Sequence, residues 1–376
     1  MFFTDQKSAG KSGYSGGLSQ RARASVQVLG SMQDFSSGQL RPVAKALFEA
    51  DPDGIAIARS QGQPGANESW ADRNARTREV CERYPAYLFE RFLQRYVAEE
   101  VYLTGIPAVA EHADLFANFV EDMGPDIGGT LELNPDLVPP GYYEQDWHLQ
   151  PGGWDGFDLY GAMFSYVAGP NIFKYGGYAA VGNREDISRN RDDTVAQFPK
   201  ASYRNIFEGG CGSASAMRAL HDRFPDARLV GCDLSKVQLK MGFAAANRLG
   251  IPVELKQRDA AQTGEADESF GAVLLYTLLH EMPVEDGIAV LREMYRILEP
   301  GGDIVLCDPP PFSEVDAFQA NILDWDTDHR EEPYFRDACS TDWAAVMREI
   351  GFVSVSAYAL TDKGAYPYIN RGSKPI

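Results

Sequence analysis

The sequence predicts an α/β protein in which a doubly wound, mostly parallel sheet follows a helical N-terminal domain. After residue 199, short apolar runs alternate with amphipathic stretches, which is typical of strands and helices in turn. A glycine-rich turn follows the first of these runs, and residues 73–122 repeat apolar side chains at helical spacing. With 376 residues, of which 44% are hydrophobic, the chain is long enough for two domains.

The composition narrows the classes of partner and the location. The 35 basic and 54 acidic residues give a net charge of −19, and so negative a surface repels nucleic acid and anionic membranes. No apolar run reaches the roughly 18 residues of a transmembrane helix, and the first residues do not resemble a secretory signal. Five cysteines without a CxxC spacing predict a reduced, cytoplasmic protein without zinc or disulfides.

The N-terminal part is predicted to be helical. Residues 1–17 are rich in Gly, Ser and Lys and are expected to be a mobile tail. Residues 18–50 predict two short helices, and turn residues over 51–70 predict a loop. The apolar stripes within 73–122 exceed what a small domain can bury alone, so we expect residues 18–123 to form a helical domain that makes a homodimer.

An aromatic-rich linker is predicted over residues 124–199. Most of its aromatic side chains lie before residue 178, together with many Pro and Gly residues. Aromatic side chains at that density either fill the space between two domains or line a pocket for a flat, apolar ligand. Both roles stay open from the sequence alone.

Strands and helices alternate in the third predicted domain, residues 200–376. Strands are expected at 204–208, 228–233, 253–257, 271–276, 303–308, 352–359 and 366–370. Helices are expected at 213–224, 236–249, 285–298 and 342–350. In such a sheet, ligands bind outside the carboxyl ends of the parallel strands.

The glycine-rich turn has the sequence EGGCGSAS, from Glu208 to Ser215, and opens a helix. Glycines let the backbone approach a ligand closely, and a helix N-terminus offers free N–H groups. Asp233 ends the next predicted strand, where a carboxylate can accept hydrogen bonds from both hydroxyls of a ribose. Asp259 follows the third strand, where it can accept from an adenine amino group.

Three interpretations of this turn are open. It could merely turn the chain, or it could bind a dinucleotide, but GxGxxG would need glycine at position 215, which is Ser215. Glu208 would oppose a pyrophosphate, whereas it suits a cationic amino group. The charge therefore favours a sulfonium-bearing nucleoside over NAD.

Residues 200–360 resemble the class I S-adenosylmethionine-dependent methyltransferases. EGGCGSAS resembles their E/DxGxGxG motif except at Ala214, and GCDLS, QRDA and ESFGAVLLYTLLHEMP resemble the motifs that follow. The resemblance implies a Rossmann-like methyltransferase fold and S-adenosylmethionine as cofactor. We expect the cofactor-binding residues to be Glu208, Gly210, Gly212, Asp233, Leu234, Asp259, Ala260 and Tyr276.

His280 is the candidate catalytic base, with Glu281 beside it. The stretch that begins LLHEMP resembles the LHDWxDE motif of plant-type and bacterial small-molecule O-methyltransferases, whose histidine is the catalytic base, although Glu-Met replaces Asp-Trp here. Glu281 could orient the imidazole or raise its basicity. The alternative is that His280 only shapes the wall of the site.

The acceptor site is expected over the fourth and fifth strands of the predicted sheet domain. The O-methyltransferase resemblance implies that the helical domain dimerises and closes this site. The segment before the first of these strands and the loop 310–330 are expected to supply its walls. The predicted acceptor-contacting residues are Trp147, His148, Trp154, Tyr160, Phe164, Tyr175 and His329.

No metal is predicted. Metal-dependent catechol-type enzymes need an Asp…Asp-Asn cluster, but Asp308 is followed by three prolines. The acidic run over 324–332 could bind a cation, form a lid over the acceptor site or be a solvated face, and we expect no ion there.

The sequence thus predicts an S-adenosylmethionine-dependent transferase that methylates a small molecule, with oxygen as the expected acceptor atom. Sulfur or nitrogen, and then carbon, are the alternative acceptors. An NAD-dependent oxidoreductase and a methyltransferase-like protein that binds the cofactor without catalysis are the alternative functions.

Overall fold

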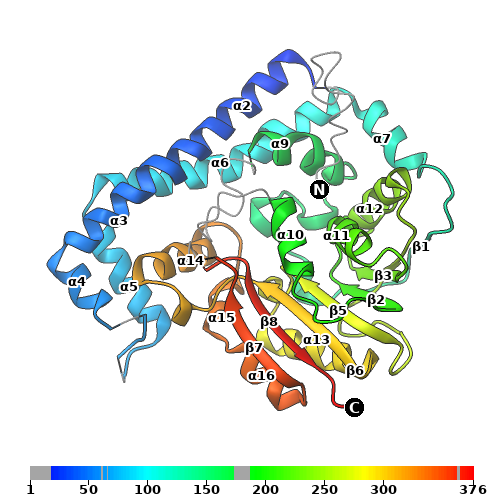
Figure 1. Ribbon diagram of the computed structural model, residues 1–376. Helices are drawn as coiled ribbons and strands as arrows, with labels where there is room; N and C mark the ends of the chain where they lie inside the picture. Colours follow the sequence, from blue (N-terminus) through cyan, green and yellow to red (C-terminus); the bar gives the residue numbers. More distant parts are fainter. Residues whose placement is uncertain (1–17, 61, 66, 173–186, 362–364) are drawn as a thin grey trace.

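The computed structural model describes residues 18–60, 62–65, 67–172, 187–361 and 365–376. The predicted tail, residues 1–17, therefore lies outside the described residues. Figure 1 shows the sheet of residues 205–376, called the sheet region below, beneath the long helices of the N-terminal part, called the helical region. This arrangement confirms the predicted fold class.

One eight-stranded sheet forms the centre of the molecule, in the order β1-β4-β3-β2-β5-β6-β8-β7. Its strands are β1 (Thr130–Glu132), β2 (Asn205–Gly209), β3 (Arg228–Asp233), β4 (Val253–Gln257), β5 (Phe270–Tyr276), β6 (Leu298–Asp308), β7 (Val353–Ala359) and β8 (Tyr368–Ser373). β8 is antiparallel to both of its neighbours, and the other pairs are parallel. The edge strand β1 was not predicted, because its three residues lie in the turn-rich aromatic segment.

Helices cover both faces of the sheet, because successive strand residues point to opposite faces. Ile206 faces one core, to which α10 (Ile187–Val195), α11 (Ser215–Arg223) and α12 (Lys236–Leu249) contribute. Phe207 faces the other core, to which α13 (Val284–Ile297) and α16 (Trp343–Ile350) contribute. The three-layer arrangement leaves the carboxyl ends of the parallel strands open for a ligand.

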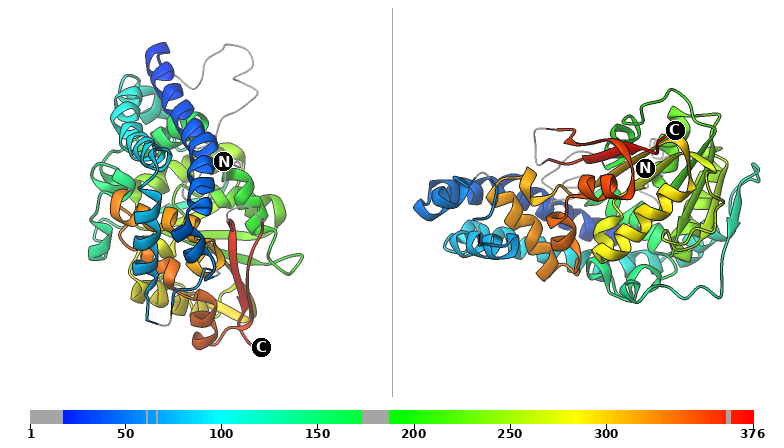
Figure 2. Two further views of the ribbon diagram at one scale, coloured as in Figure 1. Left: turned by 90° about the vertical axis from the view of Figure 1, so that its left-hand side faces the viewer. Right: turned by 90° about the horizontal axis from the view of Figure 1, so that it is seen from below.

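The helical region is built on two long antiparallel helices, α2 and α6, which lie side by side in Figures 1 and 2. Its helices are α2 (Gln20–Phe35), the π-helical turn η1 (Ser36–Leu40), α3 (Arg41–Ala50), α4 (Pro52–Ala58), α5 (Trp70–Cys81), α6 (Pro85–Ala110) and α7 (Ala113–Glu121). None of the helices within the described residues is long and apolar enough to cross a membrane.

The predicted loop over residues 51–70 is wrong in its first half, because α4 begins there. The side chain of Asp51 accepts hydrogen bonds from the backbone N–H groups of Asp53 (2.8 Å) and Gly54 (3.4 Å), and Pro52 occupies the first helical position. The Asp-Pro pair is therefore a helix start rather than a turn.

The predicted loop over residues 310–330 is also wrong, because most of it forms α14 (Ala317–His329), preceded by the turn η8 (Phe312–Glu314). Asp316 caps the helix by accepting from the N–H of Gln319 at 2.9 Å. Asp324 and Asp326 are buried rather than solvated. A run of acidic residues lies on a solvated face when no cation packs against it. Here, arginines of other helices pack against the run.

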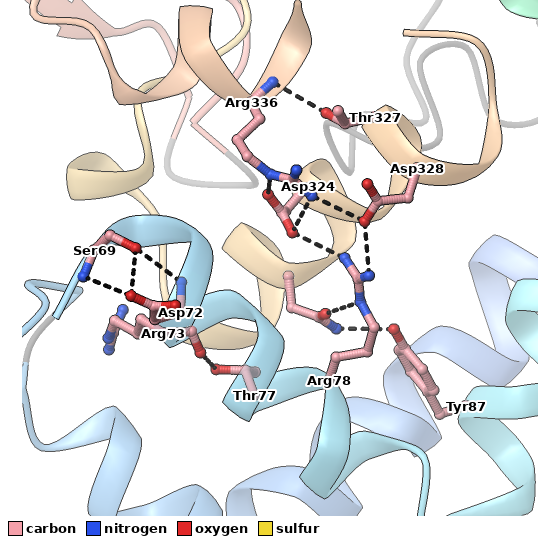
Figure 3. Close-up of polar contacts among 11 residues, drawn as sticks. Ser69, Asp72, Arg73, Thr77, Arg78, Tyr87, Asp324, Thr327, Asp328 and Arg336 are labelled. Atoms are coloured by element: carbon pink, nitrogen blue, oxygen red, sulfur yellow. Dashed lines mark hydrogen bonds and ion pairs between the residues drawn. The ribbon is translucent and has the colours of Figure 1, made fainter. Parts of the chain in front are cut away.

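Arginines of α5 and of α15 (Phe335–Ser340) converge on α14, as Figure 3 shows. Arg78 donates to Asp324 at 2.8 Å and to Asp328 at 2.9 Å, and Arg336 binds the same two carboxylates. The side chain of Asp324 is 1% exposed, so loss of its partners would leave a buried charge, which is costly. This ion-pair network fastens the helical region to the sheet region.

The aromatic segment between the two regions folds into short helical turns. They are η2 (Gly141–Tyr143), η3 (Trp147–Leu149), η4 (Gly153–Asp155), α8 (Tyr160–Ala162), the π-helical η5 (Met163–Ala168) and α9 (Gly169–Asn171). Tyr160 packs against Tyr102 of α6, and Trp147 packs against Tyr334, which follows α14. The segment therefore packs between the two regions, as one of the two open interpretations predicted.

Candidate active site

A cavity of about 360 Å³ lies at the carboxyl ends of β2, β3 and β5. Residues of the glycine-rich turn, Asp233 and Tyr276 line it from the sheet region. Val101 and Tyr102 of α6 line it from the helical region, and the aromatic segment closes a third side. The cavity thus occupies the place that a parallel sheet offers to a ligand.

The glycine-rich turn has two glycines in the left-handed backbone conformation that favours this residue. Gly210 has φ +64°, and a Cβ atom there would lie 2.4 Å from Leu278 Cδ1. Gly212 has φ +50°, and its N–H donates to Asp233 Oδ2 at 2.8 Å. The turn therefore keeps its backbone at the wall of the cavity and aligns the neighbouring carboxylate.

Asp233 is held at both carboxylate oxygens. Oδ2 accepts from Gly212, and Oδ1 accepts from the N–H of Ser235 at 2.8 Å. Each oxygen keeps a second lone pair that a ribose hydroxyl can use. Burial raises the pKa of Asp233 to about 6, although the two N–H donors lower it.

Glu208 lies at the end of β2 and is 3% exposed. Within the described part of the chain, its Oε2 atom has no hydrogen-bond partner. Burial raises the pKa of Glu208 to about 8, against the opposing effect of Arg191. A buried carboxylate with a free oxygen in a cavity fits the cationic amino group of a bound amino-acid moiety.

His280 lies in η7 (Leu279–Glu281), the turn that follows β5, and Asp308 at the end of β6 holds it. A hydrogen bond joins His280 Nδ1 to Asp308 Oδ1, and Asp308 Oδ2 accepts from the N–H of Leu279 at 2.8 Å. His280 Nε2 lies 3.4 Å from Glu281 Oε1. Burial lowers the pKa of His280, but Asp308 and Glu281 together raise it well above its usual value.

The family comparison matches this part of the chain. Residues 206–302 match the family model described as a methyltransferase domain, and they include β2, the glycine-rich turn, Asp233 and His280. The chain carries a class I S-adenosylmethionine-dependent methyltransferase domain. This confirms the predicted family and cofactor, and the free oxygen of Glu208 and the cradle of Gly210 fit that cofactor.

The methyltransferase domain is similar to curated proteins whose names describe the methylation of quinones. A demethylmenaquinone methyltransferase of Listeria welshimeri is 31% identical over 137 residues, which are 36% of this chain and 54% of the relative. A ubiquinone/menaquinone biosynthesis C-methyltransferase of Desulfotalea psychrophila is 28% identical over 158 residues, which are 39% of this chain and 62% of the relative. The chain spans about half the length of the curated relatives it matches.

Among solved structures, an O-methyltransferase family protein from Burkholderia thailandensis is 17% identical to this chain. The match has a TM-score of 0.41 and covers 55% of this chain and 60% of that protein.

The residues predicted for the cofactor all lie together in the methyltransferase domain. Glu208, Gly210, Gly212, Asp233, Leu234, Asp259, Ala260 and Tyr276 line the cavity. The two predicted catalytic residues, His280 and Glu281, line it as well.

Only some of the residues predicted to contact the acceptor line the cavity. Trp147, His148, Trp154 and Phe164 line the cavity. Tyr160 and His329 do not line it. The hydroxyl of Tyr160 donates to the carbonyl of Pro151, and the ring of His329 packs on Trp325 in α14. Tyr175 lies outside the described residues.

Both ring nitrogens of His148 contact carboxylates, although lining a cavity requires no such contacts. Its Nε2 atom lies 3.1 Å from Glu281 Oε1, and its Nδ1 atom lies 2.6 Å from Glu332 Oε1. Burial lowers the pKa of His148, but the two carboxylates raise it to about 10. His148 and Leu149 both have left-handed backbone conformations (φ 57° and 66°), and strain of this kind clusters at functional sites.

Sequence reasoning missed several residues that line the cavity or hold a residue that lines it. Asp308 could have been found, because it ends a parallel strand as Asp233 does, but we considered it only as a metal ligand. Glu332 was considered only as part of the acidic run over 324–332, and Tyr102 carried no signal, because only the packing of α6 brings it to the methyltransferase domain.

Proposed function

We propose that this protein transfers a methyl group from S-adenosylmethionine to a hydroxyl oxygen of a small molecule, with His280 as the general base. The observation that carries the proposal is that His280, which lines the same cavity as the cofactor residues, is paired with the buried Asp308 behind it. A base at this place is what an oxygen acceptor requires, because a hydroxyl must lose its proton to become a good nucleophile.

The chemistry divides between the cofactor and the protein. When bound, S-adenosylmethionine supplies an electrophilic methyl group on a sulfonium. Asp308 keeps a proton on Nδ1 of His280, so Nε2 is the atom that takes the proton of the acceptor hydroxyl once the ring is neutral. The resulting oxyanion would be the nucleophile for that methyl group, with S-adenosylhomocysteine as the leaving group, and the imidazole would then release its proton to solvent. Because the pKa of His280 is raised, the neutral fraction of the ring increases as the pH rises.

The walls support a small, flat acceptor. Trp154, Phe164 and Tyr102 line the cavity and offer aromatic surface, while Glu281 offers a carboxylate. Aromatic walls with a few polar groups are typical of sites for small apolar ligands. A phenol-like molecule combines the apolar ring and the ionisable hydroxyl that these groups suit.

Methylation of a ring carbon is the second candidate function, and the names of the quinone-methylating relatives favour it. Removal of the proton from a ring hydroxyl also makes the neighbouring ring carbons nucleophilic, so His280 would serve both reactions. The two functions differ in the product, which is a methyl ether in one case and a C-methylated ring in the other. Nuclear magnetic resonance of the product distinguishes them.

The experiment replaces the base and keeps the cofactor site. His280→Gln should lower turnover on a panel of phenols by roughly 100-fold to 10,000-fold, while the affinity for S-adenosylhomocysteine stays nearly unchanged. His221→Gln on α11 is the matched control and should keep full turnover, because His221 does not line the cavity. Full turnover in His280→Gln would leave His280 as a wall residue, and activity on thiols or amines alone would replace the oxygen acceptor by sulfur or nitrogen.

A homodimer and a cytoplasmic location also belong to this proposal. Apolar side chains on α6 are exposed, with Leu103 at 63% and Phe92 at 59%, and a second copy could cover them. Light scattering should give the mass of a dimer, and Phe92→Asp should give that of a monomer; a monomeric wild-type protein at micromolar concentration would contradict the dimer.

The cysteines bear on the location. All five are buried and unpaired, which supports a reducing compartment.

A further inference from the structure

We propose that His148, Glu281 and Glu332 bind one divalent transition-metal ion at the acceptor end of the cavity. Each residue offers one ligand atom, and these atoms lie within 4.8 Å of one another. Imidazole nitrogen and carboxylate oxygen are the ligand types that Zn²⁺, Fe²⁺ and Mn²⁺ share. The site goes beyond the proposed methyl transfer, which uses His280 and Asp308 and needs no metal.

The three side chains come from three separate segments. His148 lies in η3, Glu281 in η7 after β5, and Glu332 in the connection from α14 to α15. The imidazole stands between the two carboxylates, at 3.1 Å from Glu281 and 2.6 Å from Glu332. Metal–ligand bonds of about 2.0–2.2 Å place two ligand atoms up to about 4.4 Å apart. The ion would bind one ring nitrogen, and the carboxylate beside the other nitrogen would have to turn towards the ion to become the third ligand.

Two carboxylate oxygens of the cluster lack a partner. Among the residues that the structure describes, Glu281 Oε2 and Glu332 Oε2 make no hydrogen bond, although both atoms are buried. Glu332 as a whole is only 7% exposed. The imidazole of His148 has two N–H groups and can satisfy only one oxygen of each carboxylate, so the cluster has more acceptors than donors. A buried charged oxygen without a partner is costly, and a cation offers the missing partner.

The three side chains face the cavity, where a bound ion could contact the acceptor. All three residues line the same cavity as His280, and three protein ligands leave coordination positions open, as catalytic metal sites do. An ion there would face an oxygen of the acceptor. The ion would displace the second proton of His148, because a metal-bound imidazole is neutral.

This proposal replaces the expectation of a metal-free site that the sequence supported. Glu332 is the last residue of the acidic run over 324–332, whose earlier members Asp324 and Asp328 pair with arginines instead. Its two co-ligands lie far away in the sequence, so the spacing of acidic residues could not reveal the site.

The test measures metal binding directly. Protein stripped with a chelator is dialysed and titrated with Zn²⁺ and, separately, with Mn²⁺ in a calorimeter, and the metal content is counted by mass spectrometry. The wild-type protein should bind one ion per chain. Glu332→Gln and His148→Asn should each weaken binding by at least about tenfold, which is the lower end even for residues that only support a ligand.

A matched control distinguishes the loss of a metal ligand from the loss of one negative charge. Glu331→Gln removes the same charge at an exposed neighbouring position and should bind the ion as the wild-type protein does. Asparagine tolerates the left-handed backbone at position 148, and Glu281→Gln provides another variant should His148→Asn fail to fold. Trp154 packs 5.3 Å from the His148 ring, so tryptophan fluorescence should change when the ion binds.

Two results would overturn the metal site. One is a wild-type protein that takes up neither ion, and the other is equal binding by Glu332→Gln and Glu331→Gln. Binding of S-adenosylhomocysteine and methyl transfer are measured on the stripped protein and again on the protein reloaded with the ion. Their persistence without metal uptake rejects the metal site alone, whereas their absence alongside stoichiometric metal uptake rejects the proposed function alone.

Discussion

The two ends of the cavity differ in how the chain builds them. At the cofactor end, the glycine-rich turn, Asp233 and Asp259 all lie at or just after the ends of neighbouring parallel strands, and each belongs to a sequence motif. At the acceptor end, His280, His148, Glu332 and Tyr102 come from elements up to 230 positions apart, from Tyr102 on α6 to Glu332 after α14. The cofactor end therefore follows from local order along the chain, whereas the acceptor end follows from tertiary packing.

The difference implies a functional division. Substitutions at the cofactor end should change the affinity for S-adenosylhomocysteine, and substitutions at the acceptor end should change turnover. The three predictions below test whether the two ends are as separate as their construction suggests.

The largest effect is expected at the acceptor end, for Asp308→Asn. The amide cannot hold a proton on Nδ1 of His280 as the carboxylate does, so the imidazole presents the wrong tautomer to the acceptor. Turnover should fall by roughly 100-fold or more, with little change in the Michaelis constant.

Two further measurements distinguish a loss of the base from a general disturbance of the fold. Asp308 also accepts from the N–H of Leu279, so the melting temperature and the affinity for S-adenosylhomocysteine are measured as well, and Asp308→Glu should recover part of the turnover. A uniform loss of cofactor affinity, stability and turnover would mean that Asp308 serves the fold rather than the base.

A smaller effect is expected at the cofactor end, for Asp233→Ala. Loss of the hydrogen bonds to the ribose should weaken S-adenosylhomocysteine binding by about 1–3 kcal/mol in calorimetry. Asp226→Ala, at an exposed position before β3, should bind as the wild-type protein does, and NAD should not bind to either. Unchanged affinity in Asp233→Ala would remove this carboxylate from the cofactor site.

The smallest effect is expected from pH. The pKa of Glu208 is raised to about 8 in the free protein, so the group carries a proton at pH 6.5 and must lose it to bind a cationic amino group. Affinity for S-adenosylhomocysteine should therefore rise between pH 6.5 and 7.5, by at most about tenfold per pH unit, because one proton is released. Glu208→Gln should flatten this profile, and an unchanged slope in the variant would assign the proton to another group.

The strands and helices of the sheet region could be predicted because their signals are local. β3, β4 and α12 begin and end where the apolar periodicity placed them. β6 begins earlier than predicted because Leu298 pairs with Phe270 across a bulge, and no sequence pattern marks such a register shift.

The helical region and the acceptor end could be predicted only in part. The Asp51-Pro52 pair serves equally as a turn and as a helix start, and only the side-chain hydrogen bonds decide. The acidic residues of α14 resemble a solvated face until Arg78 and Arg336 are known to lie against them. His329 was assigned to the acceptor because a loop was expected there, and the helix turns its ring onto Trp325 instead.

A crystal structure with bound S-adenosylhomocysteine tests the central claim most directly. The cofactor product should lie with its ribose at Asp233 and its amino group at Glu208. Its sulfur should face the space between His280 and the aromatic wall formed by Trp154 and Phe164. A product bound with its sulfur directed away from His280, or bound outside this cavity, would contradict the proposed methyl transfer.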